Sequence, residues 1–182
     1  MHFLRSFAPW LAYAVLAKEV DWRYSALAGL LVSAVLVVWQ RRRRTPWDAL
    51  VIELSGALFF TLLTVFAFAA PDSPLRHEIV ALPSIWLALT AWGSLAVGKP
   101  FTLGIARTMI GPEMWDNPLF RRTNAVITAV WASGFTFHAV ALSLVHGTVG
   151  VIVVEVIGFA VPAVFTIRYP AIVRARALKE LS

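Results

Sequence analysis

The sequence predicts an all-α, polytopic membrane protein with about six transmembrane helices in three antiparallel hairpins and a short cytoplasmic interfacial helix. Composition is the first observation: 59% of the 182 residues are hydrophobic and only 14% are charged, whereas a soluble domain has about 25% charged and 45–50% apolar residues. A chain this short cannot bury such an excess in one globular core. The second observation is that its apolar residues form long runs, which organise residues 1–182 as a single integral membrane domain.

Composition also excludes several classes of protein. A mean hydropathy of +0.75 argues against a soluble enzyme and a disordered chain. The absence of cysteine excludes a disulfide scaffold, a zinc–thiolate site and a cysteine nucleophile. The net charge of +6 would indicate nucleic-acid binding in a soluble protein. In a membrane protein it indicates anionic lipid headgroups, so we expect the bilayer as a partner and no nucleic acid.

A helix needs about 20 predominantly apolar residues to cross the hydrocarbon layer. The predicted spans are 3–17, 24–39, 49–70, 79–97, 125–145 and 149–167. The first also has features of a cleaved signal peptide, with Ala-Tyr-Ala at residues 12–14. Because Pro9 and Trp10 interrupt its apolar run, we expect it to be retained as a span.

Prolines and their neighbours mark helix starts and kinks along the chain. Asn117-Pro118 places a capping amide before a proline in the first turn, which predicts the start of the helix that enters the fifth span. Pro83 and Pro162 are expected to kink the fourth and sixth spans.

Basic residues in the loops predict the orientation, because Lys and Arg gather on the cytoplasmic side. With the N-terminus, the 40–48 loop, the 98–124 loop and the C-terminal tail in the cytoplasm, thirteen of the 16 basic residues lie inside. The remaining three are Lys18, Arg23 and Arg76. We therefore expect both termini in the cytoplasm.

The interfacial loop 98–124 is predicted to contain a short helix over 100–110, stopped by Gly111-Pro112. Its apolar residues fall on one face, namely Phe101, Ile105 and Met109. Lys99 and Arg107 are available to reach headgroups. The pattern predicts a helix lying on the cytoplasmic leaflet, with an irregular loop as the alternative.

Three ionisable residues lie at membrane depth, where a charge costs several kcal/mol: Glu53, His138 and Glu155. Glu53 is about one turn inside its span, so we expect its carboxylate to reach the headgroups or an arginine of the 41–44 run. His138 and Glu155 lie eight and nine positions from His146, at the centre of the turn between their spans. Both are therefore expected roughly 12 Å below the outer surface.

His138 and Glu155 form a candidate intramembrane polar pair, since an imidazole that donates to a carboxylate relieves the desolvation cost of both. Three interpretations remain open: a structural pair, two unrelated positions, or a proton or ligand site. Small and hydroxyl residues that permit close helix approach lie nearby and favour packing: Ser133, Gly134, Thr136 and Gly158.

Motifs of assembled active sites are absent from the sequence. It contains no phosphate-binding glycine loop, no HExxH helix and no GxSxG elbow. We therefore predict no catalytic residue, no cofactor and no metal site, and expect a protein that is not an enzyme.

Several segments spread over nearly the whole chain share a pattern with a known family. They are Phe3-Leu4-Arg5-Ser6-Phe7-Ala8-Pro9, Asp21, Lys99-Pro100-Phe101, and 115–131 with Asn117-Pro118-Leu119-Phe120-Arg121-Arg122-Thr123-Asn124. In these segments the chain resembles the bacterial septation protein A family of multi-pass inner-membrane proteins, from whose type members it departs in the four-arginine run at 41–44. The resemblance implies a bacterial cytoplasmic (inner) membrane location and a non-catalytic role in cell-envelope biogenesis or division, through other inner-membrane proteins.

The resemblance also marks a candidate cytoplasmic-face motif, comprising Lys99, Pro100, Arg107, Arg121 and Asn124. Its basic members would hold lipid headgroups or a partner's cytoplasmic face. The alternative is that Asn124 and the arginines only cap and anchor the fifth span.

A different class of function is a small transporter or channel in which His138 and Glu155 line a polar path. A lipid-modifying enzyme is a third, less favoured hypothesis, because no nucleophile–base arrangement can be named. A homo-oligomer remains open.

Overall fold

The structure is a computed structural model that describes residues 5–17, 19–78, 81–145 and 147–180. Within these ranges every regular element is a helix, which confirms the all-α prediction. In chain order the helices are α2 (Ala8–Leu16), α3 (Trp22–Arg42), the 3-10 helix η1 (Trp47–Leu50), α4 (Val51–Ala69), the 3-10 helix η2 (Pro74–His77), α5 (Leu82–Ala96), α6 (Phe101–Arg107), the 3-10 helix η3 (Pro112–Met114), α7 (Pro118–Leu144) and α8 (Thr148–Glu180).

Four of the described helical segments are long and apolar enough to cross a membrane: Trp22–Arg42, Trp47–Ala69, Pro118–Leu144 and Val149–Lys179. They coincide with the second, third, fifth and sixth predicted spans. At the fourth predicted span lies α5, which is apolar but has 15 residues. At the first lies α2, with nine residues.

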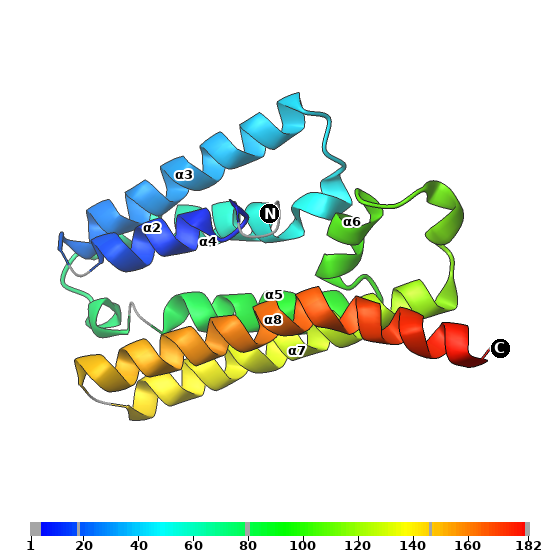
Figure 1. The fold of residues 1–182 in the computed structure, drawn as a ribbon. Coiled ribbons are helices and arrows are strands. Elements are labelled where there is room, and N and C mark those ends of the chain that lie inside the picture. The colour runs from blue at the N-terminus through cyan, green and yellow to red at the C-terminus, as the bar shows by residue number, and fades with distance from the viewer. Residues whose placement is uncertain (1–4, 18, 79–80, 146, 181–182) are drawn as a thin grey trace.

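The helices form two layers, which are seen edge-on in Figure 1. One layer contains α2, α3 and α4, with α3 packed against both of the others. The second layer contains α5, α7 and α8, with α7 packed against both of the others. Near the end that carries the C-terminus, α6 contacts elements of both layers.

Aromatic rings join the two layers. Phe7, just before α2, stacks on Trp131 of α7 with 5.2 Å between ring centroids. Phe7 also meets Phe159 of α8 edge-on at 5.2 Å. Within the first layer, Trp10 stacks on Phe59 at 5.1 Å. The segment around α2 thus inserts its rings between the long helices, where the large apolar surfaces of these rings are buried.

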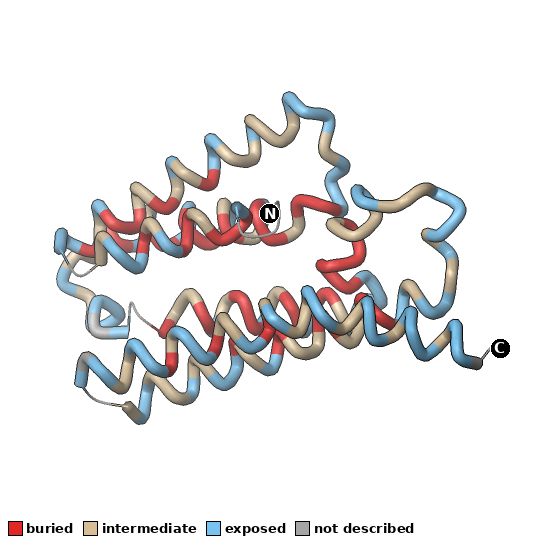
Figure 2. Tube along the Cα trace, viewed as in Figure 1, coloured by how far each residue is buried: buried red, intermediate tan, exposed pale blue. Residues whose placement is uncertain are grey.

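The outward faces of the long helices are apolar as well. Figure 2 shows the exposed positions along the outer sides of α3, α7 and α8, and they include Val35, Val140 and Val164. Contiguous exposed apolar surface of this extent is unusual for a soluble monomer. It is the pattern expected of helices that face lipid hydrocarbon.

Helix α6 occupies the predicted interfacial segment, but the predicted lipid-facing side is wrong. Phe101 is 1% exposed and belongs to the core, whereas Met109 is 62% exposed. Gly104 is the physical reason, because a Cβ at this position would overlap the backbone of Asp48 in η1. The missing side chain lets the start of α6 pack directly on η1.

Helix α8 is longer than the predicted sixth span, which ends at residue 167. It runs for 33 residues through both Pro162 and Pro170, so the predicted C-terminal tail is helical. The predicted close approach of the last two spans is confirmed. A Cβ on Gly134 would lie 2.7 Å from Cγ of Pro162, and one on Gly158 would lie 3.3 Å from the His138 side chain.

Candidate functional site

A cavity of about 200 Å³ lies among α2, α5, α7 and α8. His138 of α7 and Glu155 of α8 both line it. The structure therefore brings together the two residues that the sequence places at equal depth. The two side chains share this cavity, and no ion pair joins them in the described part of the chain.

His138 is held through a residue of a different helix. Its Nδ1 lies 2.6 Å from Oγ of Ser84 in α5, within hydrogen-bond distance. The ring also lies against Gly158 of α8, which leaves room for it. Its second ring nitrogen, Nε2, is buried and makes no hydrogen bond to any described residue. The geometry therefore fixes one nitrogen and leaves the other free to bind a ligand.

Glu155 presents a carboxylate to the same cavity. It lies three and four positions before Gly158 and Phe159, so the three residues share one face of α8. All three line the cavity. Glu155 makes no hydrogen bond or ion pair with a described residue, and the described lining contains neither Lys nor Arg. Its negative charge is therefore available to a ligand.

Five other residues that line this cavity are aromatic. The aromatic lining residues are Phe7, Trp10, Tyr13, Phe135 and Phe159. The faces of such rings attract cations, by about 0.5–2 kcal/mol each. A carboxylate among aromatic rings is a combination that can bind a small organic cation.

Glu53 lies in a second polar cluster, which the sequence did not predict. Its side chain is buried, with 2% exposure. Oε1 accepts hydrogen bonds from Oγ of Ser6 and Nε2 of Gln40, each at 2.6 Å. The carboxylate thereby links the segment before α2 to α3 and α4.

The expected contact of Glu53 with headgroups or with the 41–44 arginines is therefore wrong. Two of these arginines lie over tryptophan rings. Cζ of Arg41 is 3.9 Å from the centroid of the Trp47 ring, and Cζ of Arg43 is 4.1 Å from the centroid of the Trp39 ring. Gln40, directly before the run, reaches Glu53 in their place. A polar uncharged residue at the end of an apolar run was the available signal.

The candidate cytoplasmic-face motif separates into buried and exposed residues. Pro100 is buried at the start of α6, and Asn124 is buried in α7, where its Nδ2 donates to the Phe120 carbonyl. Arg107 pairs with Asp48, with 3.3 Å between Nη1 and Oδ2. The other two residues, Lys99 and Arg121, are exposed.

Asn124 also accepts at its backbone carbonyl from Oγ1 of Thr102 in α6. It therefore connects α6 to α7, while the cap of α7 is Asn117, whose side chain accepts from the backbone N–H groups of Leu119 and Phe120. This confirms the helix start predicted from Asn117-Pro118.

Comparison with protein-family models, curated proteins and solved structures gives no match for this chain. In the described part of the chain, no three His, Asp or Glu side chains gather where a metal ion would bind.

Proposed function

We propose that this chain is an integral membrane transporter that binds a small organic cation in the cavity of His138 and Glu155. The observation that supports this function is the Glu155 carboxylate, which lines a cavity with five aromatic residues and with neither Lys nor Arg among its described lining residues. An ionisable group kept at membrane depth is costly, so a ligand that compensates its charge is the physical explanation that suits it best.

The bound cation would be recognised by three kinds of contact. Glu155 supplies the opposite charge, the rings of Trp10 and Phe135 supply cation–π and apolar contacts, and Nε2 of His138 supplies a hydrogen-bonding group. Tetraethylammonium matches the first two contacts, and a trialkylammonium ion, whose N–H can donate to an unprotonated Nε2, matches all three.

The proposed topology has six crossings, with both termini in the cytoplasm of a bacterium and the protein in its inner membrane. Two observations support it. The basic run 41–44, the loop that follows α5 and the end of α8 lie toward one end of the molecule, while the turns after α2, α4 and α7 lie toward the other (Figure 1). In addition, α5 lies alongside the long helices as a shorter, apolar helix, and α2, with nine residues, packs against α3 and would form part of the first crossing.

A flux measurement tests the proposed function. Full-length protein in proteoliposomes is expected to take up tetraethylammonium, and Glu155→Gln is expected to abolish this uptake. Glu78→Gln is the matched control, because Glu78 is exposed and lies outside the cavity lining. Uptake equal to that of protein-free vesicles, or equal uptake by Glu155→Gln and the wild type, would contradict the function.

We also propose a role in cell-envelope biogenesis or division through inner-membrane partners, supported by the sequence resemblance at residues 3–9 and 115–131. This role is non-catalytic and compatible with a binding cavity. Two measurements test this role: cell division in a deletion strain, and co-purification of membrane proteins with this chain after gentle extraction. Normal division and the absence of a specific membrane partner would argue against it.

A further inference from the structure

A groove of about 450 Å³ lies between α6, α7 and α8, at the end of the molecule that carries the C-terminus. Ile105 of α6, Ile127 of α7 and Val173 of α8 contribute apolar side chains to its walls. Ligand pockets in proteins are usually about 300–1,000 Å³ and mainly apolar. The groove is separate from the cavity of His138 and Glu155, with which it shares no lining residue.

The threonine hydroxyl groups of this groove already have partners within the protein. Thr123 Oγ1 donates to the Leu119 carbonyl, and Thr166 Oγ1 donates to the Pro162 carbonyl. Because these hydroxyl groups have partners, they do not require a polar ligand in the groove. The walls can therefore accept a hydrocarbon chain.

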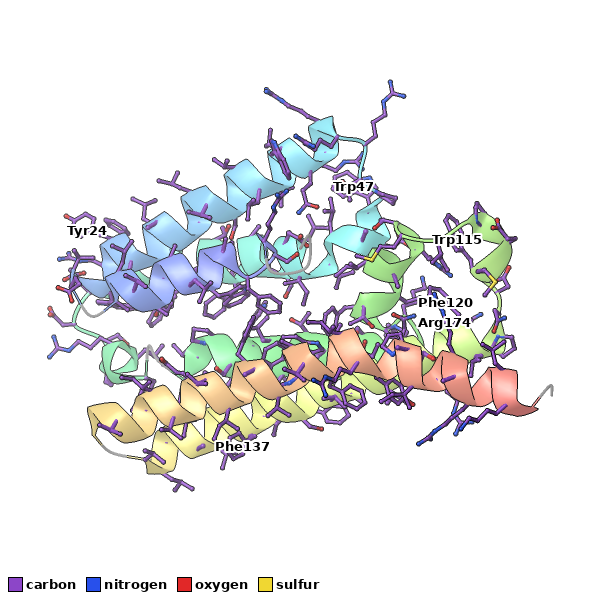
Figure 3. All side chains as sticks on the ribbon, in the orientation of Figure 1. Tyr24, Trp47, Trp115, Phe120, Phe137 and Arg174 are labelled. Atoms are coloured by element: carbon purple, nitrogen blue, oxygen red, sulfur yellow. The ribbon has the colours of Figure 1, made fainter. Side chains whose placement is uncertain are left out.

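Arg174 supplies the charge at this groove. It lines the groove, is exposed, and makes no hydrogen bond or ion pair within the described part of the chain. Figure 3 shows it next to Phe120, below the loop that carries Trp115. Arg107 differs in this respect, because Asp48 already neutralises it. A guanidinium binds phosphate through paired N–H donors.

We infer that this groove binds one anionic phospholipid, with an acyl chain along Ile105 and Ile127 and its phosphate at Arg174. Charge complementarity selects the occupant, since the described lining holds a free cation and no acidic residue. In the proposed topology the groove lies at the cytoplasmic surface, where anionic lipids are supplied by the membrane itself. The inference is independent of cation transport.

Native mass spectrometry of the full-length protein tests this inference. The probes are phosphatidylglycerol and phosphatidylcholine with identical acyl chains, and phosphatidylglycerol is expected to remain bound at least fivefold more often. Arg174→Gln should remove this preference. Arg176→Gln is the matched control, because Arg176 is exposed on the same helix but does not line the groove.

A second pair of variants tests the apolar part of the site. Val173→Trp should fill the groove and lower retention of phosphatidylglycerol, whereas Ile172→Trp, at an exposed neighbouring position outside the lining, should not. Unchanged thermal unfolding in phosphatidylcholine verifies that each variant is folded.

The inference would be overturned by equal retention of the two lipids, or by equal lipid preference of the Arg174→Gln and Arg176→Gln variants. Displacement of phosphatidylglycerol by glycerol 3-phosphate at equal concentration would also overturn it. That result would show a simple phosphate site. A dimer in lipid-free detergent that Val173→Trp dissociates would also overturn it, because the groove would then be occupied by a second copy.

Discussion

Glu53 lies in the layer of α2, α3 and α4, and Glu155 lies in the layer of α5, α7 and α8. Both are carboxylates within helices long enough to cross a membrane, but their surroundings differ. Glu53 is 2% exposed and accepts hydrogen bonds from Ser6 and Gln40. Glu155 lines a cavity and makes no hydrogen bond or ion pair with a described residue. Donors within the protein thus hold Glu53, whereas the proposed ligand would supply the partner of Glu155.

Both layers contain close helix contacts, so the difference lies in what surrounds each carboxylate. In the first layer, a Cβ on Gly29 of α3 would lie 2.6 Å from the ring of Phe60 in α4, so the helices are in close contact around a filled core. In the second layer, α7 and α8 are equally close at Gly134. The rings of α2 and the start of α5 leave the cavity beside His138.

Neutral substitution of each glutamate should give the largest contrast between the layers. Glu155→Gln should abolish tetraethylammonium flux without changing thermal stability, because its carboxylate is free to bind the cation. Glu53→Gln should retain flux, because an amide oxygen can still accept from Ser6 and Gln40. Proteoliposome uptake and thermal unfolding measure both effects. Loss of flux in both variants with both folds intact would show that Glu53 belongs to the same path.

Gly104→Ala should give the largest loss of stability. Helix α6 contacts η1 and α7, and an added Cβ would overlap the Asp48 backbone, which no side-chain rotation relieves. Overpacking costs about 1–3 kcal/mol, and we expect the upper end of this range. Gly93→Ala is the control, since nothing lies within 4 Å of a Cβ there. Equal unfolding midpoints in detergent for the two variants would show that α6 does not couple the layers.

Local signals in the sequence predicted local structure well. Asn117-Pro118 predicted a cap that the structure confirms through the N–H groups of Leu119 and Phe120. The equal depth of His138 and Glu155 was predicted by counting residues from an antiparallel turn, whereas the cavity that both residues line was not. These inferences depend only on neighbours in sequence or on one turn.

Contacts between distant segments could not be predicted in the same way. Ser84 lies 54 positions from His138, and their hydrogen bond depends on how α5 and α7 are rotated. An apolar run contains no signal for this rotation, since lipid-facing and core-facing residues are alike in a membrane. Phe101 illustrates this limit, because its ring suits either environment. Gly104, a small residue in the same helix, was the available signal for the close backbone contact, which was not predicted.

Glu53→Ala should have an intermediate effect on stability. Removal of the carboxylate leaves the Ser6 hydroxyl and the Gln40 amide without their acceptor, and an unsatisfied buried group costs about 1–3 kcal/mol. We expect a loss of about 2 kcal/mol, measured by unfolding in detergent. Glu53→Gln should recover most of it. No difference between the alanine and glutamine variants would mean that the hydrogen bonds contribute nothing to the first layer.

Ser84→Ala should have a smaller effect, of about 1 kcal/mol, because it removes one hydrogen bond from His138. It should also weaken tetraethylammonium binding, since the imidazole is then free to turn in the cavity. Quenching of tryptophan fluorescence reports binding, because Trp10 lines the cavity. Ser143→Ala is the control, as its hydroxyl donates within its own helix to the Val140 carbonyl. Binding unchanged in Ser84→Ala would show that the serine does not position the imidazole.

Asp21 provides the smallest expected effect and the clearest pH dependence. Hydrogen bonds from the Arg23 side chain, and then from its backbone N–H, lower the pKa of Asp21 below its ordinary value of 3.8. A carboxylate with a lowered pKa in the folded state stabilises the protein above its unfolded pKa and loses this contribution as the pH falls through the folded pKa. The wild type should therefore unfold at a slightly higher temperature than Asp21→Ala at about pH 7, and this difference should shrink as the pH falls from about 4 through the lower pKa of the folded state. Asp21→Asn, which retains a capping oxygen without the charge, should show a difference from Asp21→Ala that does not change with pH. A wild-type difference that is also independent of pH would mean that the oxygen acts through its cap geometry and the charge contributes nothing.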